Sequence, residues 1–71
     1  MSKSANRVNR FIRLREVMSM TGLSKSSIYD YMNLGLFPTT ISLGSRSVGW
    51  VESEIEQWMD NQIARRDQEV A

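Results

Sequence analysis

The sequence predicts a mainly α-helical domain that carries one β-hairpin. Two short stretches of helical periodicity are joined by a glycine-containing turn, a stretch of alternating residues follows, and helical periodicity then returns. Two helices joined by such a tight turn are typical of a helix-turn-helix. We therefore predict a winged helix-turn-helix, in which the hairpin is the wing. Residues 1–10 are expected to form a flexible basic arm, residues 11–66 the domain and residues 67–71 a C-terminal tail.

Length and composition exclude several classes of protein. A chain of 71 residues has room for one domain with one small core. It contains no cysteine and no histidine, so it has no disulfides and lacks the usual zinc ligands. Cysteine and histidine are thereby excluded as catalytic nucleophiles or bases, which leaves only scattered carboxylates, and we expect no enzyme, no cofactor and no metal. The chain also lacks an apolar run of the roughly 20 residues that cross a bilayer, and its first residues lack a signal peptide's apolar core. We expect a cytoplasmic protein with no membrane partner.

The net charge of +1 conceals a strong asymmetry along the chain. Residues 1–46 contain seven lysines and arginines against two acidic residues, whereas residues 47–71 contain two against six. Such a division predicts a basic half that faces a polyanion and an acidic half that faces away from it. The alternative is a basic, disordered tail attached to an ordinary domain.

The first helix is predicted to follow a short apolar segment. Residues 11–14, "FIRL", are partly alternating and form either an edge strand or a lead-in to the helix. Gly22 is expected to end the helix, since glycine is favoured just past a helix C-terminus. Residues spaced i, i+3, i+4 and i+7 place one face toward the core: Leu14, Val17, Met18 and Thr21.

The second helix is predicted to begin one residue beyond that turn. Ser24 is a favourable N-cap, because its side-chain oxygen can accept a hydrogen bond from a backbone N–H of the first turn. Gly35 is expected to stop the helix. Its inward face is predicted from the spacing i, i+3, i+4: Ile28, Tyr31 and Met32.

The hairpin is predicted from a change of period between Thr39 and Trp50. Apolar residues alternate with small or polar ones on both sides of Gly44 and Ser45, and Gly-Ser is an accepted pair for a hairpin turn. An isolated hairpin is marginal in water, so its apolar face is expected to lie on the helices. Arg46 is then placed at the far end of the wing.

A third helix is predicted from about Glu52 to near Arg66. Acidic residues gather in its first turns, where the helix dipole favours negative charge, and two arginines lie near its end. We expect Trp50 and Trp58 to be core residues, because a domain this small needs large apolar side chains. The predicted inward stripe of this helix comprises Ile55, Trp58, Met59 and Ile63.

The outer face of the second helix is the predicted recognition surface. In a helix-turn-helix this helix enters the major groove of DNA, and hydroxyl, amide and lysine side chains suit phosphates and base edges. Arginines of the basic half are expected on phosphates. For each residue the alternative is plain solvation. The candidate DNA-binding residues are Arg13, Arg15, Ser24, Lys25, Ser26, Ser27, Tyr29, Asp30, Asn33 and Arg46.

Three of these candidates have particular expectations. Asp30 is repelled by phosphate unless it accepts a hydrogen bond from a cytosine amino group or turns onto Lys25 or Arg15. Asn33 is able to pair with adenine, although it lies late in the helix. Arg46 has little to pack against at a hairpin tip, and we predict a contact to phosphate or to a narrow minor groove.

Three blocks carry a family resemblance over most of the chain, from about Phe11 to Arg66. They read "RLREVMSMTGLSKSSIY", "FP" and "LGSRSVGWVESEIEQW", closing with "IARR". In sequence and spacing they resemble the AlpA family of prophage regulators, a branch of the MerR-like winged helix-turn-helix group that also includes phage excisionases. The resemblance implies a recognition helix at Ser24–Leu34 and a wing at Thr39–Trp50. Members often carry a basic residue where this chain has Asp30, so their base preference does not transfer.

The resemblance also implies partners and a role. The expected partner is double-stranded DNA at an attachment site or a promoter, and further partners would be an integrase or additional copies of the chain. The expected role is regulation of integrase transcription, or promotion of excision as a directionality factor. No small-molecule ligand is expected. The alternative is a protein-interaction module that keeps the scaffold without binding DNA.

Overall fold

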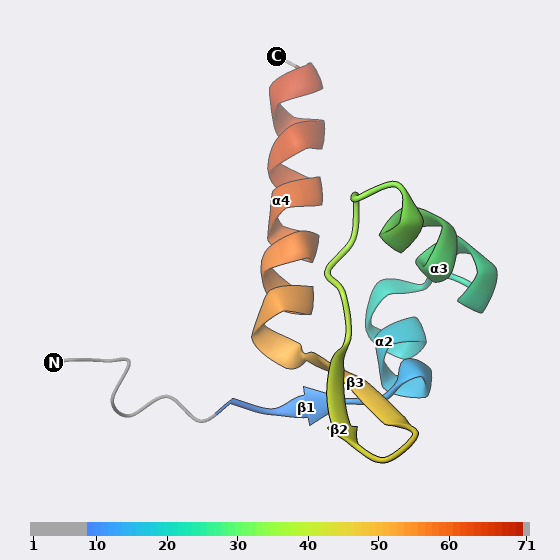
Figure 1. The fold of residues 1–71 in the computed structure, drawn as a ribbon. Coiled ribbons are helices and arrows are strands. Elements are labelled where there is room, and N and C mark those ends of the chain that lie inside the picture. Colours follow the sequence, from blue (N-terminus) through green and yellow to red (C-terminus); the bar gives the residue numbers. More distant parts are fainter. Residues whose placement is uncertain (1–8, 71) are drawn as a thin grey trace, which may run out of the picture.

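The computed structural model describes residues 9–70 and has the predicted winged helix-turn-helix architecture (Figure 1). Three helices accompany a three-stranded antiparallel sheet whose strands lie in the order β1-β3-β2. The elements, labelled as in Figure 1, are β1 (Phe11–Ile12), α2 (Leu14–Thr21), α3 (Lys25–Asn33), β2 (Ile41–Gly44), β3 (Ser47–Val51) and α4 (Glu52–Val70).

The turn between α2 and α3 forms as its sequence predicts. Gly22 adopts a left-handed conformation with φ 77°, and its N–H donates to the Met18 carbonyl at 2.8 Å. Ser24 caps α3, because its hydroxyl oxygen accepts a hydrogen bond from the Ser27 N–H at 3.2 Å. Glycine supplies the positive φ at no steric cost and serine satisfies an amide of the first turn. These two residues determine where α2 ends and where α3 begins.

The segment "FIRL" contributes an edge strand to the sheet. Ile12 of β1 pairs with Trp50 of β3, so the chain before the helices is tied to the strand after them. Gly49 explains how closely the strands approach, since a Cβ added there would lie 2.9 Å from the Ile12 carbonyl oxygen and from a Leu43 methyl group. A glycine in this central strand is therefore a packing requirement.

The hairpin turn lies one residue later than predicted. Gly44 pairs with Ser47, so the turn residues are Ser45 and Arg46 instead of Gly44 and Ser45. Because Ser42 pairs with Val48, one extra residue is accommodated in β2 before the turn, which is a β-bulge. Arg46 consequently takes a left-handed conformation with φ 62°.

The core is built from six buried residues, and Trp50 is the largest of them. Its side chain is fully buried, and its Nε1–H donates to the Pro38 carbonyl at 3.1 Å. The predicted core position of Trp50 is thus confirmed. Tyr31 and Met32 are partly buried and pack against the core, as the period of the second helix predicted. The six residues are Ile12, Val17, Ile28, Phe37, Trp50 and Ile55.

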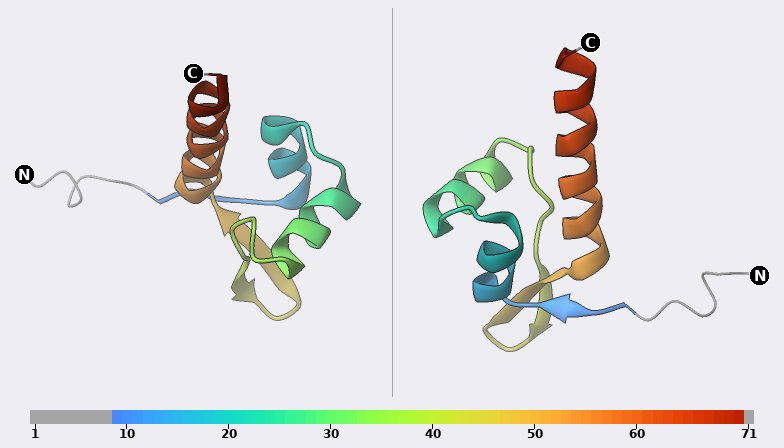
Figure 2. Two further views of the ribbon diagram at one scale, coloured as in Figure 1. Left: turned by 90° about the horizontal axis from the view of Figure 1, so that it is seen from above. Right: turned by 180° about the vertical axis from the view of Figure 1, so that it is seen from behind.

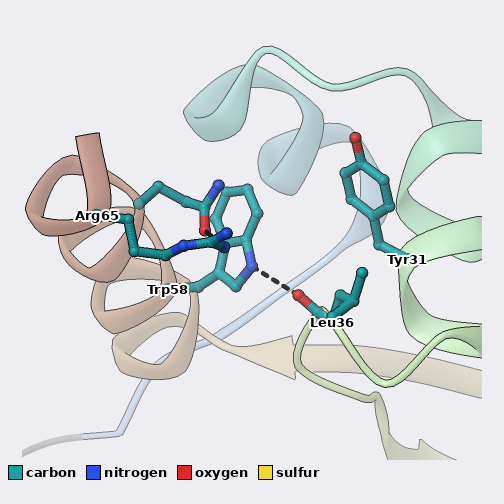
Figure 3. A pocket seen from close by; sticks show the side chains of 5 residues that line it. Tyr31, Leu36, Trp58 and Arg65 are labelled. Atoms are coloured by element: carbon teal, nitrogen blue, oxygen red, sulfur yellow. Dashed lines mark hydrogen bonds between the residues drawn. The ribbon is translucent and has the colours of Figure 1, made fainter. Parts of the chain in front are cut away.

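Trp58 lies at the margin of this core. Its ring packs edge-to-face on Phe37, with 4.9 Å between ring centroids, and its Nε1–H donates to the Leu36 carbonyl at 2.8 Å. Figure 3 shows this hydrogen bond, with Tyr31 across from Trp58. The groove that these two residues line together with Leu36 and Arg65 has a volume of about 210 Å³. Trp58 therefore holds the loop between α3 and β2 against α4, but part of its surface remains exposed.

Helix α4 is longer than predicted and its apolar stripe is shorter. The helix continues to Val70 instead of ending near Arg66, so the residues expected in a C-terminal tail are helical up to that point. Ile63 is 51% exposed, and its assignment to the inward stripe is wrong. The reason is visible in Figures 1 and 2, where α4 extends past α2 and α3, away from the wing tip. Every side chain from Asp60 to Glu69 is exposed.

Arg10 is docked on the domain, although the sequence assigned it to a flexible arm. Its guanidinium pairs with Glu16 at 3.0 Å and also with Glu52, and its carbonyl accepts from the Glu52 N–H at 2.7 Å. The hydrogen bonds that Arg10 donates to the carboxylates of Glu16 and Glu52 raise the pKa of Arg10 above its ordinary value. The rest of the predicted arm, residues 1–8, lies outside the described residues.

Candidate nucleic-acid interface

The outer face of α3 presents the side chains that the sequence selected. Ile28 is fully buried and faces the core, which turns the opposite side of the helix to solvent. The exposed residues of that side include a cation, a hydroxyl, an aromatic ring, a carboxylate and an amide, and this mixture suits the backbone and base edges of DNA. They are Lys25, Ser26, Tyr29, Asp30 and Asn33.

Three serine hydroxyls gather at the start of α3. The Ser24 hydroxyl donates to the Ser27 hydroxyl at 3.0 Å while accepting from the Ser27 N–H, and it lies 3.4 Å from the Ser26 hydroxyl. Ser24 is therefore committed to capping the helix. Ser26 is exposed and Ser27 is partly buried, so these two are better placed to meet DNA than Ser24.

Tyr29 joins the recognition helix to the wing, which the sequence analysis missed. Its ring packs edge-to-face on Trp50 of β3, with 6.3 Å between centroids and an interplanar angle of 61°, and the residue stays 37% exposed. Seen from above, α3 lies beside the hairpin (Figure 2). The contact restricts where the Tyr29 hydroxyl can point. Helical periodicity had only placed Tyr29 outside the buried stripe, because the period carries no information about a residue 21 positions away in the sequence.

Arg46 occupies the wing tip in an unfavourable backbone conformation. Its side chain is exposed, and a φ of 62° is a conformation that arginine rarely adopts and glycine adopts readily. Such a conformation costs about 1 kcal/mol or more. The wing tip therefore presents a charged side chain from a backbone conformation that glycine would adopt without strain.

Arg13 and Arg15 are not gathered with α3 and the wing. Both line a separate groove of about 520 Å³ between β1 and α2, which Phe11 and Ile12 also line. Phe11 is 51% exposed. No residue of α3 or of the hairpin lines this groove, which Glu16 and Ser19 complete. The predicted phosphate contacts of the two arginines are therefore separate from the rest of the candidate interface.

Asp30 has no ion-pair partner within residues 9–70. The ion pairs found there join Arg10 to Glu16, Arg10 to Glu52 and Arg66 to Asp67. The predicted turn of Asp30 onto Lys25 or Arg15 is thus not formed. Acceptance of a hydrogen bond from a cytosine amino group stays a prediction.

The described part of the chain offers little for other kinds of chemistry. Among its aspartates and glutamates, no three come together as a metal ion would need. None of its helices combines the length and the apolar character that a bilayer span requires.

Comparison with known proteins shows which family the chain resembles. Residues 10–63 match the family model described as prophage CP4-57 regulatory protein (AlpA). The uncharacterized protein ORF88 of Enterobacteria phage P4 is 47% identical over 57 residues, which cover 80% of this chain and 65% of that protein. The DNA-binding transcriptional activator AlpA of Escherichia coli (strain K12) is 39% identical over 56 residues, which cover 70% of this chain and 80% of that protein.

Proposed function

This chain belongs to the AlpA family of prophage regulatory proteins, and on that premise we propose that it binds duplex DNA sequence-specifically. Helix α3 reads the major groove and the β2–β3 hairpin contacts the neighbouring backbone or minor groove. The protein acts in the bacterial cytoplasm as a regulator encoded by a phage-like element. The family consists of regulatory proteins that bind DNA, and no catalytic step is assigned to this chain.

The observation that carries this proposal is the joint placement of α3 and the wing. Tyr29 on Trp50 ties the outer face of α3 to β3, and β3 leads back to the strained Arg46 at the tip. A recognition helix and a wing held at a fixed angle can read two grooves at once. Base contacts are assigned to Ser26, Ser27 and Tyr29, with Asp30 and Asn33 at the far end of the helix.

Two roles within this function are tested by one experiment. The protein either activates the promoter of an integrase gene or binds an attachment site so that recombination runs toward excision. Footprinting the full-length protein on both DNAs, with a random duplex of equal length as the control, separates the two roles. Protection of one DNA only assigns the role, and protection of both assigns both. Equal affinity for all three duplexes contradicts sequence-specific binding.

The salt dependence of binding affinity distinguishes DNA binding from binding by an apolar protein-interaction module on the same scaffold. Binding through phosphates releases counterions, so the logarithm of affinity falls linearly with the logarithm of salt concentration. We expect a slope of about −3 to −5 for a domain with a few phosphate contacts. If the measured affinity stays unchanged between low and physiological salt, the basic residues of the candidate interface do not bind DNA phosphates.

Removing the Tyr29 hydroxyl should weaken recognition of the cognate site without weakening the fold. Tyr29→Phe keeps the ring on Trp50 and deletes only the group that can hydrogen-bond to a base edge. A lost base contact costs about 1–3 kcal/mol of discrimination, so cognate affinity should fall about tenfold while affinity for random DNA stays constant. Tyr31→Phe, on the inward side of α3, is the matched control. Equal losses on both DNAs would make Tyr29 a phosphate contact.

Arg46 should show opposite effects on stability and on binding. Arg46→Gly relieves the strain of the positive φ, so we expect the free energy of unfolding to rise by about 0.5–1 kcal/mol. Arg46→Ala retains the strain and should change the free energy of unfolding by less than about 0.5 kcal/mol. Both variants should lose DNA affinity several-fold, with a salt slope smaller by about one. Urea unfolding and a salt titration measure the two effects. Wild-type affinity in both variants would remove the wing from the interface.

A further inference from the structure

Two tryptophans bind the loop that leads from the recognition helix to the wing. This loop comprises residues 34–40, between α3 and β2. The Nε1–H of Trp58 donates to the Leu36 carbonyl at 2.8 Å (Figure 3), and the Nε1–H of Trp50 donates to the Pro38 carbonyl at 3.1 Å. Among residues 9–70, only these two side chains donate to a backbone carbonyl more than four residues away. The loop is therefore held at two points, by α4 and by β3.

Leu36 links the first of these points directly to α3. Its N–H donates to the Tyr31 carbonyl at 2.8 Å, the N–H of Gly35 donates to the Met32 carbonyl at 3.1 Å, and Gly35 takes a left-handed conformation with φ 74°. This pattern is a Schellman motif, which closes the last turn of a helix. The backbone of Leu36 is thus bonded to α3 through its N–H and to α4 through its carbonyl, so the position of Trp58 is transmitted to the end of α3.

Trp50 connects the second point to the wing and to α3 at the same time. It belongs to β3, a strand of the wing, and its ring packs against the ring of Tyr29 on α3. Between the two hydrogen-bonded points Phe37 is 5% exposed, and its ring packs edge-to-face on Trp58. A tryptophan side chain has one hydrogen-bond donor. In both tryptophans this donor is bonded to the segment that connects the recognition helix with the wing.

We propose that Trp50 and Trp58 are positioning residues for DNA recognition, whose indole N–H groups hold α3 and the wing in the arrangement in which both meet one DNA site. In this role neither tryptophan touches DNA. The inference rests on the proposed function, since it concerns how that binding becomes specific. Base contacts require placement within about 0.5 Å, whereas phosphate contacts carry no sequence information and tolerate small displacements. Loss of either N–H group should therefore reduce specificity before it reduces general affinity.

Replacing each tryptophan by β-(3-benzothienyl)alanine tests its N–H group alone. In this amino acid a sulfur atom replaces the ring N–H, so the side chain keeps its size and shape and loses only the donor. A chain of 71 residues can be made by chemical synthesis with the analogue in place of Trp50, of Trp58 or of both. DNA affinity is measured at a temperature at which circular dichroism shows every chain to be folded. The two probes are the duplex protected in the footprinting experiment and a random duplex of equal length.

Discrimination between the two duplexes should fall while general affinity stays. For each analogue we expect cognate affinity to fall about fivefold, which corresponds to one hydrogen bond. Affinity for the random duplex and the salt slope should match the parent. The loss caused by Arg46→Ala should also be smaller in the analogue chains, because a displaced wing gains less from its tip. Distant residues without a shared role have additive effects, so this coupling is a result that packing alone does not produce.

Ile55→Val is the matched control for stability. It removes one methyl group from a fully buried residue of α4, at a cost similar to that of one hydrogen bond. Its thermal midpoint should fall, but its discrimination between the two duplexes should match that of the parent.

The contrary outcomes separate this inference from the proposed function. An analogue that keeps the discrimination of the parent overturns the positioning role of that tryptophan. If Ile55→Val loses as much discrimination as the analogues, specificity follows stability and the proposal is overturned. Equal losses on both duplexes, or additive effects with Arg46→Ala, make the tryptophans packing residues only. A parent chain that binds both duplexes equally contradicts the proposed function and this inference with it.

Discussion

Trp50→Ala is expected to unfold the domain at ambient temperature. The side chain is fully buried at the meeting point of β3, α3 and the loop after α3. Its ring packs against the ring of Tyr29, and its Nε1–H donates a hydrogen bond to the Pro38 carbonyl. Truncating a buried tryptophan to alanine costs about 3–5 kcal/mol. The total stability of a domain of this size is about 5 kcal/mol or less. Circular dichroism should show loss of most helical signal or a melting transition shifted far downward.

Trp58→Ala is the matched comparison for that variant. Trp58 also packs against a ring and also donates to a backbone carbonyl, but part of its surface is exposed. Its loss should cost about 2 kcal/mol, because less apolar area is removed and water can replace the hydrogen-bond partner. The two thermal midpoints should therefore differ clearly. Equal midpoints would mean that Trp50 does not hold the core together.

Reversing two charges at the candidate interface should produce the largest loss of DNA binding. In Lys25→Glu combined with Arg46→Glu, one change lies at the start of α3 and the other at the wing tip, and both side chains are exposed. Each lost phosphate contact weakens binding several-fold at physiological salt, and the introduced carboxylates add repulsion. We expect affinity to fall by about 100-fold on cognate and random duplexes alike, with a salt slope smaller by about two.

A second double charge reversal changes the net charge by the same amount, but it lies on α4 and outside the candidate interface. Arg65→Glu combined with Arg66→Glu alters exposed residues on the projecting part of α4. Because charges separated by more than about 8 Å are screened at physiological salt, DNA affinity should change little. The pair of variants thus distinguishes local contacts from a general effect of net charge. If both double variants lose affinity equally, α3 and the wing tip are not the binding surface.

The parts of the fold that were predictable are those specified by neighbouring residues. Gly22 and Ser24 determine a helix end and a helix start through their own backbone and side chain, so the turn between α2 and α3 was correctly placed. The buried faces of α2 and α3 followed from the period of their apolar residues. The order of helix, helix, hairpin and helix followed from the changes of period along the chain, and the structure confirms it.

The parts that were missed depend on contacts between distant residues. Helical periodicity placed Ile63 on a stripe, but it could not show that the body of the domain ends before that turn of α4. The bulge in β2 moved the turn onto Arg46, where local preference would select glycine. Arg10 finds Glu52 across 42 residues, and exposed charges leave no trace of such pairing in the sequence. At the candidate interface, the residues of α3 remain predictions, and only their exposure is established.

The strand order has a consequence for the way in which this protein is made. Because β1 pairs with β3, the first strand of the domain stays without a partner until residues 47–51 have left the ribosome. The helix-turn-helix is complete in sequence well before that point, but Val17 and Ile28 can pack on Trp50 only after translation has passed it. The ribosome adds about 5–20 residues per second to a chain, whereas small domains fold within milliseconds to seconds. The nascent recognition helix should therefore remain unstructured, and unable to bind DNA, until nearly the whole chain has emerged.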